Sequence, residues 1–400
     1  MTQLRMSFVL CIVALLPIAT PRAQQPAFKS GVDLVAVDVQ VVDDKSTPVT
    51  GLGADRFEVT IGGRKRRVVS AEFVRAEASP TAPRAPAAPT SSPNTVVAAP
   101  AAPSAQPRIF VLTVDTSSFD VGVSRGMTTA AKTFVERLAP SDIVGLSAYP
   151  YGPIVNPTTD HGAVLAALDR VVASRDRPSI PLTPTEILSG TGGFYAQKRC
   201  GNDVSCMRMV EIEIKEMVAQ AESEASRSLG ALRAILEGLS KVDGRKMLVL
   251  LSGGLVASES PAGRPSVGDL GVVLGQEAAR ANTAIYTLFV DWQYLKQFDA
   301  SKSGVPSAFG SGDSRVLSGW LSKFTDSAGG KLFTVIAGSG ESAFDRILTE
   351  TSAYYLLGVE PDVADRDGRP RELKVKLLSS PRGTSLRARS WVVVPADVKN

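Results

Sequence analysis

The sequence predicts an α/β fold in which a mostly parallel sheet carries helices on both faces, with β segments at either end of the chain. Three observations support this prediction. Between residues 108 and 352, short apolar runs typical of buried parallel strands alternate with segments of helical periodicity. Residues 28–75 and 353–394 show instead the alternating side chains and turn residues of β structure. An Ala/Pro-rich stretch separates the first β segment from the α/β region.

Composition argues against several classes of function. The 400-residue chain has 44 basic and 40 acidic residues, a formal net charge of +4, and a single histidine, His161. One histidine cannot supply a two-histidine metal motif, and His161 stands at the expected start of a helix rather than beside a nucleophile. The nearly balanced charge gives no reason to expect nucleic acid as a partner. We therefore expect neither an enzyme nor a nucleic-acid-binding protein.

The first 23 residues have the features of a secretory signal peptide. Arg5 precedes an apolar stretch of nine residues, 8–16, which is too short to span a bilayer. Pro17 ends that stretch, and cleavage could follow Ala23. No later stretch of the sequence has enough consecutive apolar residues to span a membrane. We expect a secreted or periplasmic protein without a membrane span after cleavage. An uncleaved N-terminal anchor is the alternative.

Two cysteines remain after such cleavage, Cys200 and Cys206, in a polar segment typical of a loop. An oxidising compartment would allow them to form a structural disulfide. Their spacing excludes a C-x-x-C redox motif, and two free thiols are the alternative.

The N-terminal β segment, residues 28–75, begins with a Val-rich strand over residues 33–42. A hairpin follows, with one strand at residues 56–61 and its turn at Gly62 and Gly63. The return strand opens with four basic residues, 64–67, which we interpret as a solvated edge strand protected by its charges. A basic binding patch is the alternative.

The stretch from residue 76 to 107 contains 11 Ala and 8 Pro. It cannot bury enough apolar area to offset the entropy of ordering it, so we expect an extended linker. The α/β domain then spans residues 108–352.

Strands of the α/β domain are expected at residues 109–114, 143–148, 247–251, 284–290 and 331–335. The second of these turns back into a short third strand at residues 154–155, so this pair should be antiparallel. Asp160 is placed to cap the helix after it. An insertion at residues 175–225 interrupts the alternation, and its C-terminal part reads as helix. That helix either packs on its own domain or binds a partner.

The C-terminal segment, residues 353–394, contains three further strand patterns. Together with residues 28–75 they could form one sandwich-like β domain into which the α/β domain is inserted. Two separate small β units are the alternative.

Function is expected at the end of the first α/β strand, because open α/β sheets bind ligands at the carboxyl ends of their strands. Asp115 and Ser117 stand there in a D-x-S pattern, followed by Phe119 and Asp120. A strand ending in this way resembles the first loop of the metal-ion-dependent adhesion site of von Willebrand factor A domains. The hairpin, and Ser252 with Gly253 after a later strand, are similar to that fold as well.

The chain resembles one subgroup of these proteins more closely, the von Willebrand factor A-related proteins of secreted bacterial type. The shared features are the signal peptide, the Val-rich strand before residues 50–59, the basic residues before strand 247–251, and the segments at residues 351–358 and 386–389. The resemblance covers residues 28–75 and 108–394. It implies a Rossmann-like α/β domain.

The resemblance also implies a site in which hydroxyls and carboxylates from three loops hold Mg²⁺, with an acidic group of a partner completing the shell. Asp115 and Ser117 match the first loop, but Phe119 replaces its second serine and Gly253 stands where the third loop has aspartate. Candidates for the second-loop hydroxyl are Ser226, then Thr185 and Ser228. Asp120 or Glu259 could compensate for the lost carboxylate. We therefore expect a degenerate site that needs no cofactor, with Mg²⁺ or Ca²⁺ as the ion if one binds.

These observations predict a secreted or periplasmic interaction module of the adhesion type, whose partner protein the sequence does not identify. A structural component of an envelope assembly is the alternative function, with catalysis a distant third. The expected binding surface comprises Asp115, Ser117, Phe119, Asp120, Ser252 and Gly253.

Overall fold

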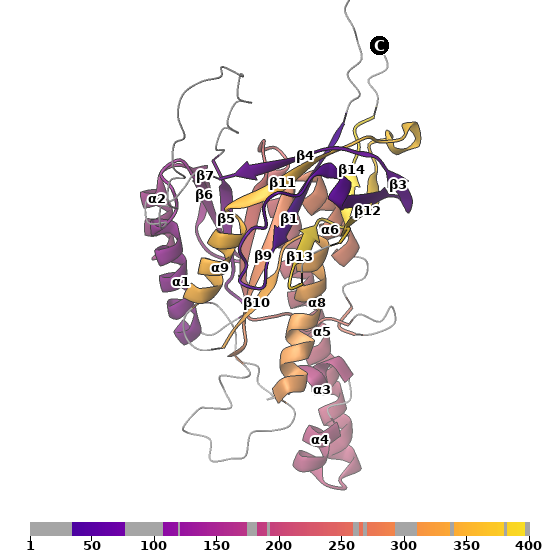
Figure 1. Ribbon diagram of the computed structural model, residues 1–400. Coiled ribbons are helices and arrows are strands. Elements are labelled where there is room, and N and C mark those ends of the chain that lie inside the picture. Colours follow the sequence, from indigo (N-terminus) through magenta and orange to yellow (C-terminus); the bar gives the residue numbers. More distant parts are fainter. Residues whose placement is uncertain are drawn as a thin grey trace, which may run out of the picture. The chain divides into compact units, whose positions relative to one another are not determined.

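The computed structural model describes residues 34–76, 107–118, 121–173, 182–189, 193–258, 264–266, 270–292, 310–336, 340–379 and 382–396 (Figure 1). All of them belong to one compact unit that begins at Leu34. The predicted signal peptide and nearly all of the predicted linker lie outside the described residues. None of the helices in the described part of the chain is both long enough and apolar enough to cross a membrane.

A six-stranded sheet forms the centre of the α/β region. Its strands are β5 (Ile109–Asp115), β6 (Ile143–Tyr149), β7 (Ile154–Thr158), β8 (Lys246–Ser252), β9 (Thr283–Val290) and β10 (Leu332–Val335). They follow the order β10-β9-β8-β5-β6-β7, and every pair is parallel except the β6–β7 hairpin. The apolar runs make β5, β8 and β9 buried along their whole length. The mostly parallel sheet predicted from the sequence is confirmed.

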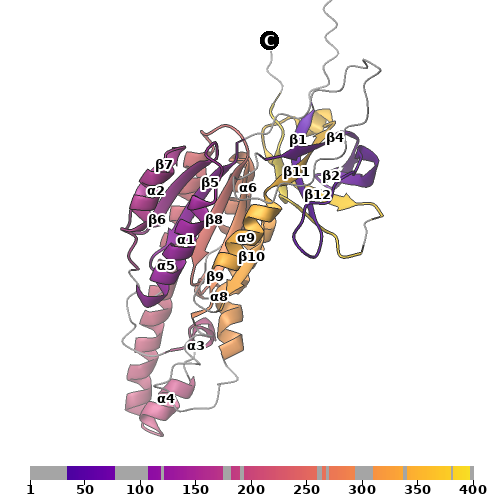
Figure 2. The same cartoon turned by 60° about the vertical axis from the view of Figure 1, so that its left-hand side comes forward.

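Helices cover both faces of this sheet (Figure 2). One face packs against α1 (Val121–Glu136), α2 (His161–Leu168) and α9 (Glu341–Glu350), with Phe110, Phe134 and Phe344 in contact at its centre. The other face packs against α5 (Val204–Leu239), α6 (Leu270–Arg280) and α8 (Gly310–Ser327). The Asp160 side chain accepts a hydrogen bond from the amide of Ala163, which caps α2.

The helical insertion contains α3 (Pro184–Ser189), α4 (Gly193–Cys200) and the first half of α5, beside which α3 and α4 lie in Figure 1. A small core of their own holds them together, and its buried members are Leu182, Ala196, Val210, Ile214 and Val218. The boundary predicted at residue 225 lies inside α5, because this single 36-residue helix continues from the insertion onto the sheet. Its buried residues face its own domain along most of its length.

A disulfide joins Cys200 at the end of α4 to Cys206 in the first turn of α5, with Cα atoms 5.5 Å apart. This is the predicted pairing.

Closing so short a loop stabilises a protein by about 2 kcal/mol through the entropy of the unfolded chain. We expect the Cys200→Ser/Cys206→Ser double variant to lose about that much free energy of unfolding. Urea denaturation with and without a reductant measures it: the reductant should weaken the wild-type protein and leave the variant unchanged, and equal curves for all samples would contradict the prediction.

Strands from the two ends of the chain pair in two further antiparallel sheets. The N-terminal strands are β1 (Val35–Val42), β2 (Phe57–Ile61), β3 (Arg64–Arg66) and β4 (Val68–Arg75), and the C-terminal strands are β11 (Ala353–Val359), β12 (Pro370–Leu377), β13 (Ser385–Ala388) and β14 (Trp391–Val393). The sheet orders are β13-β1-β11-β4 and β14-β12-β2-β3. Alternating residues of both sheets meet in one core around Val39, Val59 and Tyr355. Each sheet therefore needs both segments of the chain.

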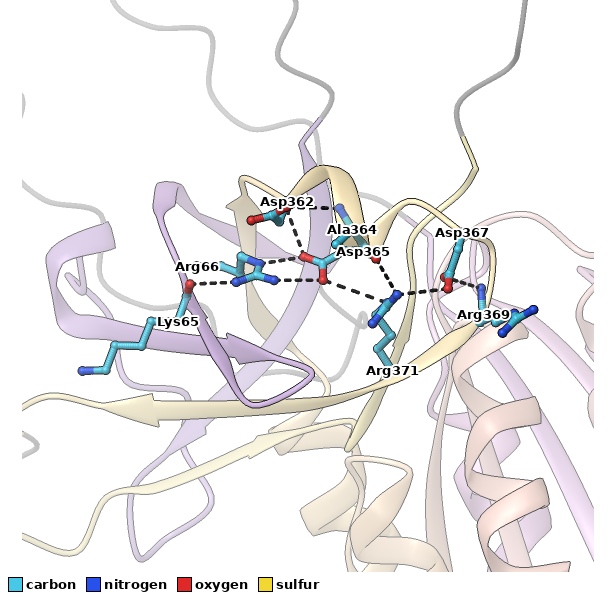
Figure 3. A network of polar contacts seen from close by, with 8 residues as sticks. All are labelled: Lys65, Arg66, Asp362, Ala364, Asp365, Asp367, Arg369 and Arg371. Carbon is cyan, nitrogen blue, oxygen red and sulfur yellow. Dashed lines mark hydrogen bonds and ion pairs between the residues drawn. The ribbon is translucent and has the colours of Figure 1, made fainter.

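The basic run on the edge strand β3 departs from its prediction at one residue. Arg64, Lys65 and Arg67 are exposed, but the Arg66 side chain is only 8% exposed. Its Nε and Nη2 donate to the two carboxylate oxygens of Asp365, at 2.6 and 2.9 Å (Figure 3). The interpretation of four solvated charges is therefore wrong for Arg66, because the 3₁₀ turn Val363–Asp365 brings a carboxylate over this strand.

Candidate functional site

Asp115 ends the central strand β5 and lies at the middle of a group of serine hydroxyls. Only 3% of the residue is exposed. Its Oδ1 accepts a hydrogen bond of 2.8 Å from Ser117 Oγ, and its Oδ2 accepts one of 2.8 Å from Ser228 Oγ. Ser252 Oγ, at the end of the adjacent parallel strand β8, lies 3.5 Å from the same Oδ2. We call Ser117, Ser118, Ser228 and Ser252 the serine cluster.

A direct contact between two loops closes one side of this site. Ser118 Oγ donates to the Asp115 carbonyl at 2.8 Å and accepts from the Gly253 amide at 2.7 Å. The Gly253 carbonyl in turn accepts from Trp292 Nε1 at 3.0 Å. A Cβ atom on Gly253 would lie 2.2 Å from the Ser118 carbonyl oxygen, so this position has no space for any side chain. The aspartate that the resemblance would place here is therefore excluded sterically.

Burial governs the ionisation of Asp115. It raises the pKa of the carboxyl from 3.8 to about 6, although the hydrogen bonds from Ser228, Ser117 and Ser252 oppose this rise. Tyr149, which is also buried, lies 3.4 Å from Ser228 Oγ through its hydroxyl. Burial and the nearby Asp115 charge raise the pKa of Tyr149 well above its usual range, so its phenol stays neutral.

The prediction that Ser226 supplies the second-loop hydroxyl is corrected by the structure. Residue 226 lies within α5 and its side chain is exposed, whereas Ser228, two positions later, is buried against Asp115. The phase of the helix decides this, since residues two apart point to nearly opposite sides. The other rival, Thr185, donates from its amide and its Oγ1 to Asp313 Oδ1, at 3.0 and 2.6 Å.

Several predicted residues cannot be placed. Phe119, Asp120 and Glu259 lie outside the described residues, so their contribution to the binding surface stays a prediction.

The single histidine, His161, is the first residue of α2, and its Nε2 lies 2.8 Å from the Asp142 carbonyl oxygen. Its contact is therefore with the backbone, while the Ser252 hydroxyl contacts Asp115 and Ser118.

A cavity of about 180 Å³ opens beside the serine cluster, between the carboxyl end of the sheet and helices α3, α5 and α8. We call it the α5 cavity. A second hollow of about 80 Å³ shares Ser117, Glu224 and Ser228 with it and is also lined by Asp115. The walls of the α5 cavity contain both apolar and charged residues, among them Met217, Glu224, Arg227, Val256, Trp292 and Leu317.

The described side chains of this site would leave most of the shell of a Mg²⁺ or Ca²⁺ ion to water or to a partner. Ca²⁺ takes six to eight oxygen ligands, and Mg²⁺ takes six in octahedral geometry, usually several waters beside one or two carboxylates. Here Asp115 has both oxygens engaged by serine hydroxyls, and Glu224 is the other acidic residue among the described residues that line the two hollows. Within the described part of the chain, no group of three or more His, Cys, Asp and Glu side chains could hold a metal ion.

The sequence did not single out Ser118, Glu224, Arg227 or Trp292. Ser118 was detectable, because it is the hydroxyl next to Ser117 in the same loop. Glu224 and Ser228 are four positions apart, which places them on one face of a helix, so knowing the phase of α5 would have joined them. No local signal marks Trp292, which reaches the site from the end of β9.

Comparison with known proteins does not identify a family for this chain. No family model matches the chain, and no curated protein matches it either. Among solved structures, the crystal structure of the conserved hypothetical protein BatB from Bacteroides thetaiotaomicron is similar at 12% sequence identity and a TM-score of 0.31. That match covers 62% of this chain and 97% of that chain. A likeness of this size identifies neither a family nor a function for this chain.

Proposed function

We propose that this protein is an extracytoplasmic interaction module, a divergent relative of von Willebrand factor A domains, that binds a protein partner at the carboxyl end of its parallel sheet. The supporting features are the antiparallel β6–β7 hairpin in an otherwise parallel sheet, the D-x-S sequence at the end of β5, and the meeting of Ser117, Ser228 and Ser252 at Asp115. The disulfide suits an oxidising compartment.

The α5 cavity is the observation that carries the proposal. Pockets for cofactors and drug-sized ligands measure roughly 300–1,000 Å³, so a cavity of about 180 Å³ has the size for one or two side chains of a partner. Beside it, Tyr151 is 72% exposed and available for contact. The hydroxyls of Ser117, Ser228 and Ser252 donate to the buried carboxylate of Asp115, and His161 contacts the Asp142 carbonyl oxygen rather than these serines, so the described site has no Ser-His pair.

Partner binding in this proposal requires no metal ion. A cation that bound the folded protein would stabilise it by mass action, by about 2.7 kcal/mol when its concentration is a hundred times its dissociation constant. We expect the melting temperature to be unchanged by millimolar Mg²⁺, Ca²⁺ or Mn²⁺ after treatment with a chelator. A reproducible rise with one of these ions, abolished in Asp115→Ala, would contradict metal independence and restore the metal-dependent version of the site.

Photo-crosslinking in living cells that produce the protein tests both the proposed function and its alternative, a structural component of an envelope assembly. A benzophenone amino acid replaces Tyr151 beside the cavity in one variant, and Val363, 81% exposed in the β region, in the other. We expect a discrete crosslinked partner from position 151 and none from position 363. Crosslinking from position 363 alone would favour the alternative, a structural component whose β sheets make the lasting contacts. Crosslinking from neither position would refute both functions at these surfaces.

A further inference from the structure

We propose that the α5 cavity binds a lysine side chain of the partner, with its ammonium group held by Glu224 and the hydroxyl oxygens of Ser117 and Ser228. This inference rests on the proposed function and names the chemistry of the partner.

The serine hydroxyls present oxygen lone pairs rather than protons to a ligand. Ser117 Oγ and Ser228 Oγ each donate their hydrogen to Asp115, at 2.8 Å. A hydroxyl has one hydrogen and two acceptor lone pairs, so both oxygens remain able to accept. Both residues line the cavity. These two hydroxyl oxygens can therefore accept hydrogen bonds from a ligand that donates them, but they have no hydrogen left to donate to a ligand carboxylate.

Glu224 adds a charged acceptor on the same face of α5. It lies one helical turn before Ser228, so the two side chains are neighbours. Its Oε1 accepts a hydrogen bond of 3.0 Å from Gln220 Nε2, and Glu224 is an exposed residue that lines the cavity. An ammonium group has three donors and no acceptor, which corresponds to one carboxylate oxygen and two hydroxyl oxygens.

The charges that line the α5 cavity and the neighbouring hollow together add up to one negative charge. Asp115 and Glu224 carry negative charge at neutral pH, and Arg227 is the positive residue among the described residues lining the two hollows. Arg227 and Glu224 form no ion pair in the described structure, although both lie on α5. Arg227 therefore leaves the carboxylate available, and its own charge should oppose a cationic ligand and favour an anionic one.

The apolar wall suits the aliphatic stem of lysine. Met217, Val256 and Leu317 line the cavity together with the ring of Trp292. Lysine packs its four methylene groups against apolar surface while its charged end reaches polar groups. A compact ammonium is also easier to enclose in a small cavity than the planar guanidinium of arginine, which needs its acceptors in one plane.

Fluorine NMR of the protein labelled with 5-fluorotryptophan tests the inference, because Trp292 lines the cavity and Trp320 and Trp391 do not. The probes are Nα-acetyl-lysine amide, its uncharged analogue Nα-acetyl-norleucine amide, and Nα-acetyl-glutamate amide, each titrated through the millimolar range. We expect the lysine probe alone to shift the Trp292 resonance saturably. A response to the glutamate probe, or to none of the three, would overturn the inference.

Three variants test whether the cavity prefers a cationic or an anionic ligand. Glu224→Gln should weaken the apparent affinity for the lysine probe about tenfold, since the ammonium then meets a neutral acceptor in place of a charged one. Arg227→Gln should strengthen it, and Glu237→Gln, an exposed glutamate elsewhere on α5, should leave it unchanged. Weaker binding in Arg227→Gln would show a carboxylate-binding site instead. Crosslinking of a partner from position 151 without lysine binding would refute this inference and leave the proposed function standing.

Discussion

Replacing Asp115 by asparagine is expected to raise the free energy of unfolding at pH 7 by up to about 3 kcal/mol. Burial raises the pKa of this carboxyl from 3.8 to about 6, and each pKa unit corresponds to about 1.4 kcal/mol. Asparagine keeps the shape of the side chain and an acceptor for one serine, and it carries no charge. The wild-type protein therefore gives up stability to keep an ionised group beneath the α5 cavity.

The pH dependence of this difference provides the measurement. Well below pH 3.8 the carboxyl is protonated in both folded and unfolded chains, so wild type and variant should be about equally stable. Between pH 4 and 6 the unfolded chain ionises while the folded protein retains the proton, so wild-type stability falls as pH rises. Above pH 6 the difference should be constant. Urea denaturation from pH 4 to 8 gives the curve, and a difference independent of pH would contradict the assigned ionisation.

Asp365→Asn is the matched control with the opposite sign. The Arg66 guanidinium holds the pKa of this carboxyl below its usual value, so its charge stabilises the folded state. The variant should lose about 3 kcal/mol at pH 7, because it leaves the guanidinium of Arg66 largely buried without its carboxylate. Its deficit should shrink as pH falls and the wild-type carboxyl becomes protonated. If both aspartates behaved alike, the mutations would be reporting general damage rather than charge.

The sheet could be predicted from the sequence because its strands are fully buried and therefore read as continuous apolar runs. Residues 247–251 and 284–290 were placed to within a residue of β8 and β9. The register and order of strands depend on contacts between distant segments, and only the resemblance offered a guide to them. The pairing of Arg66 with Asp365, 299 positions apart, had no local signal at all.

The site was predictable where its residues are adjacent in sequence or follow a neighbouring strand, as Ser252 and Gly253 follow β8. Asp115 and Ser117 stand in one loop, and the D-x-S pattern was sufficient to connect them. Ser228 lies 113 positions from Asp115 on a helix whose start the sequence did not fix, so its phase was unknown and Ser226 was preferred. The cavity depends on α3, α5 and α8 meeting at the sheet, and this arrangement is tertiary.

Gly253→Ala is expected to destabilise the protein by about 4 kcal/mol, the largest effect of any substitution considered at the site. The new Cβ would lie 2.2 Å from the Ser118 carbonyl oxygen and 2.9 Å from its carbon. The neighbouring atoms are backbone, so the strand-end loops must separate. That separation costs overpacking strain together with the hydrogen bonds from Gly253 to Ser118 and from Trp292 to Gly253.

Gly230→Ala is the control, because a Cβ there meets nothing within 4 Å and alanine favours an exposed helical position by about 1 kcal/mol over glycine. Chemical denaturation should therefore move in opposite directions for the two variants. Gly253→Asp carries the same Cβ and should be at least as unstable as Gly253→Ala, so an aspartate at this position would open the loops before it supplied a metal ligand. A stable Gly253→Asp protein that gained thermal stability from Mg²⁺ would contradict the steric argument. It would also show that one missing carboxylate separates this site from a cation-binding one.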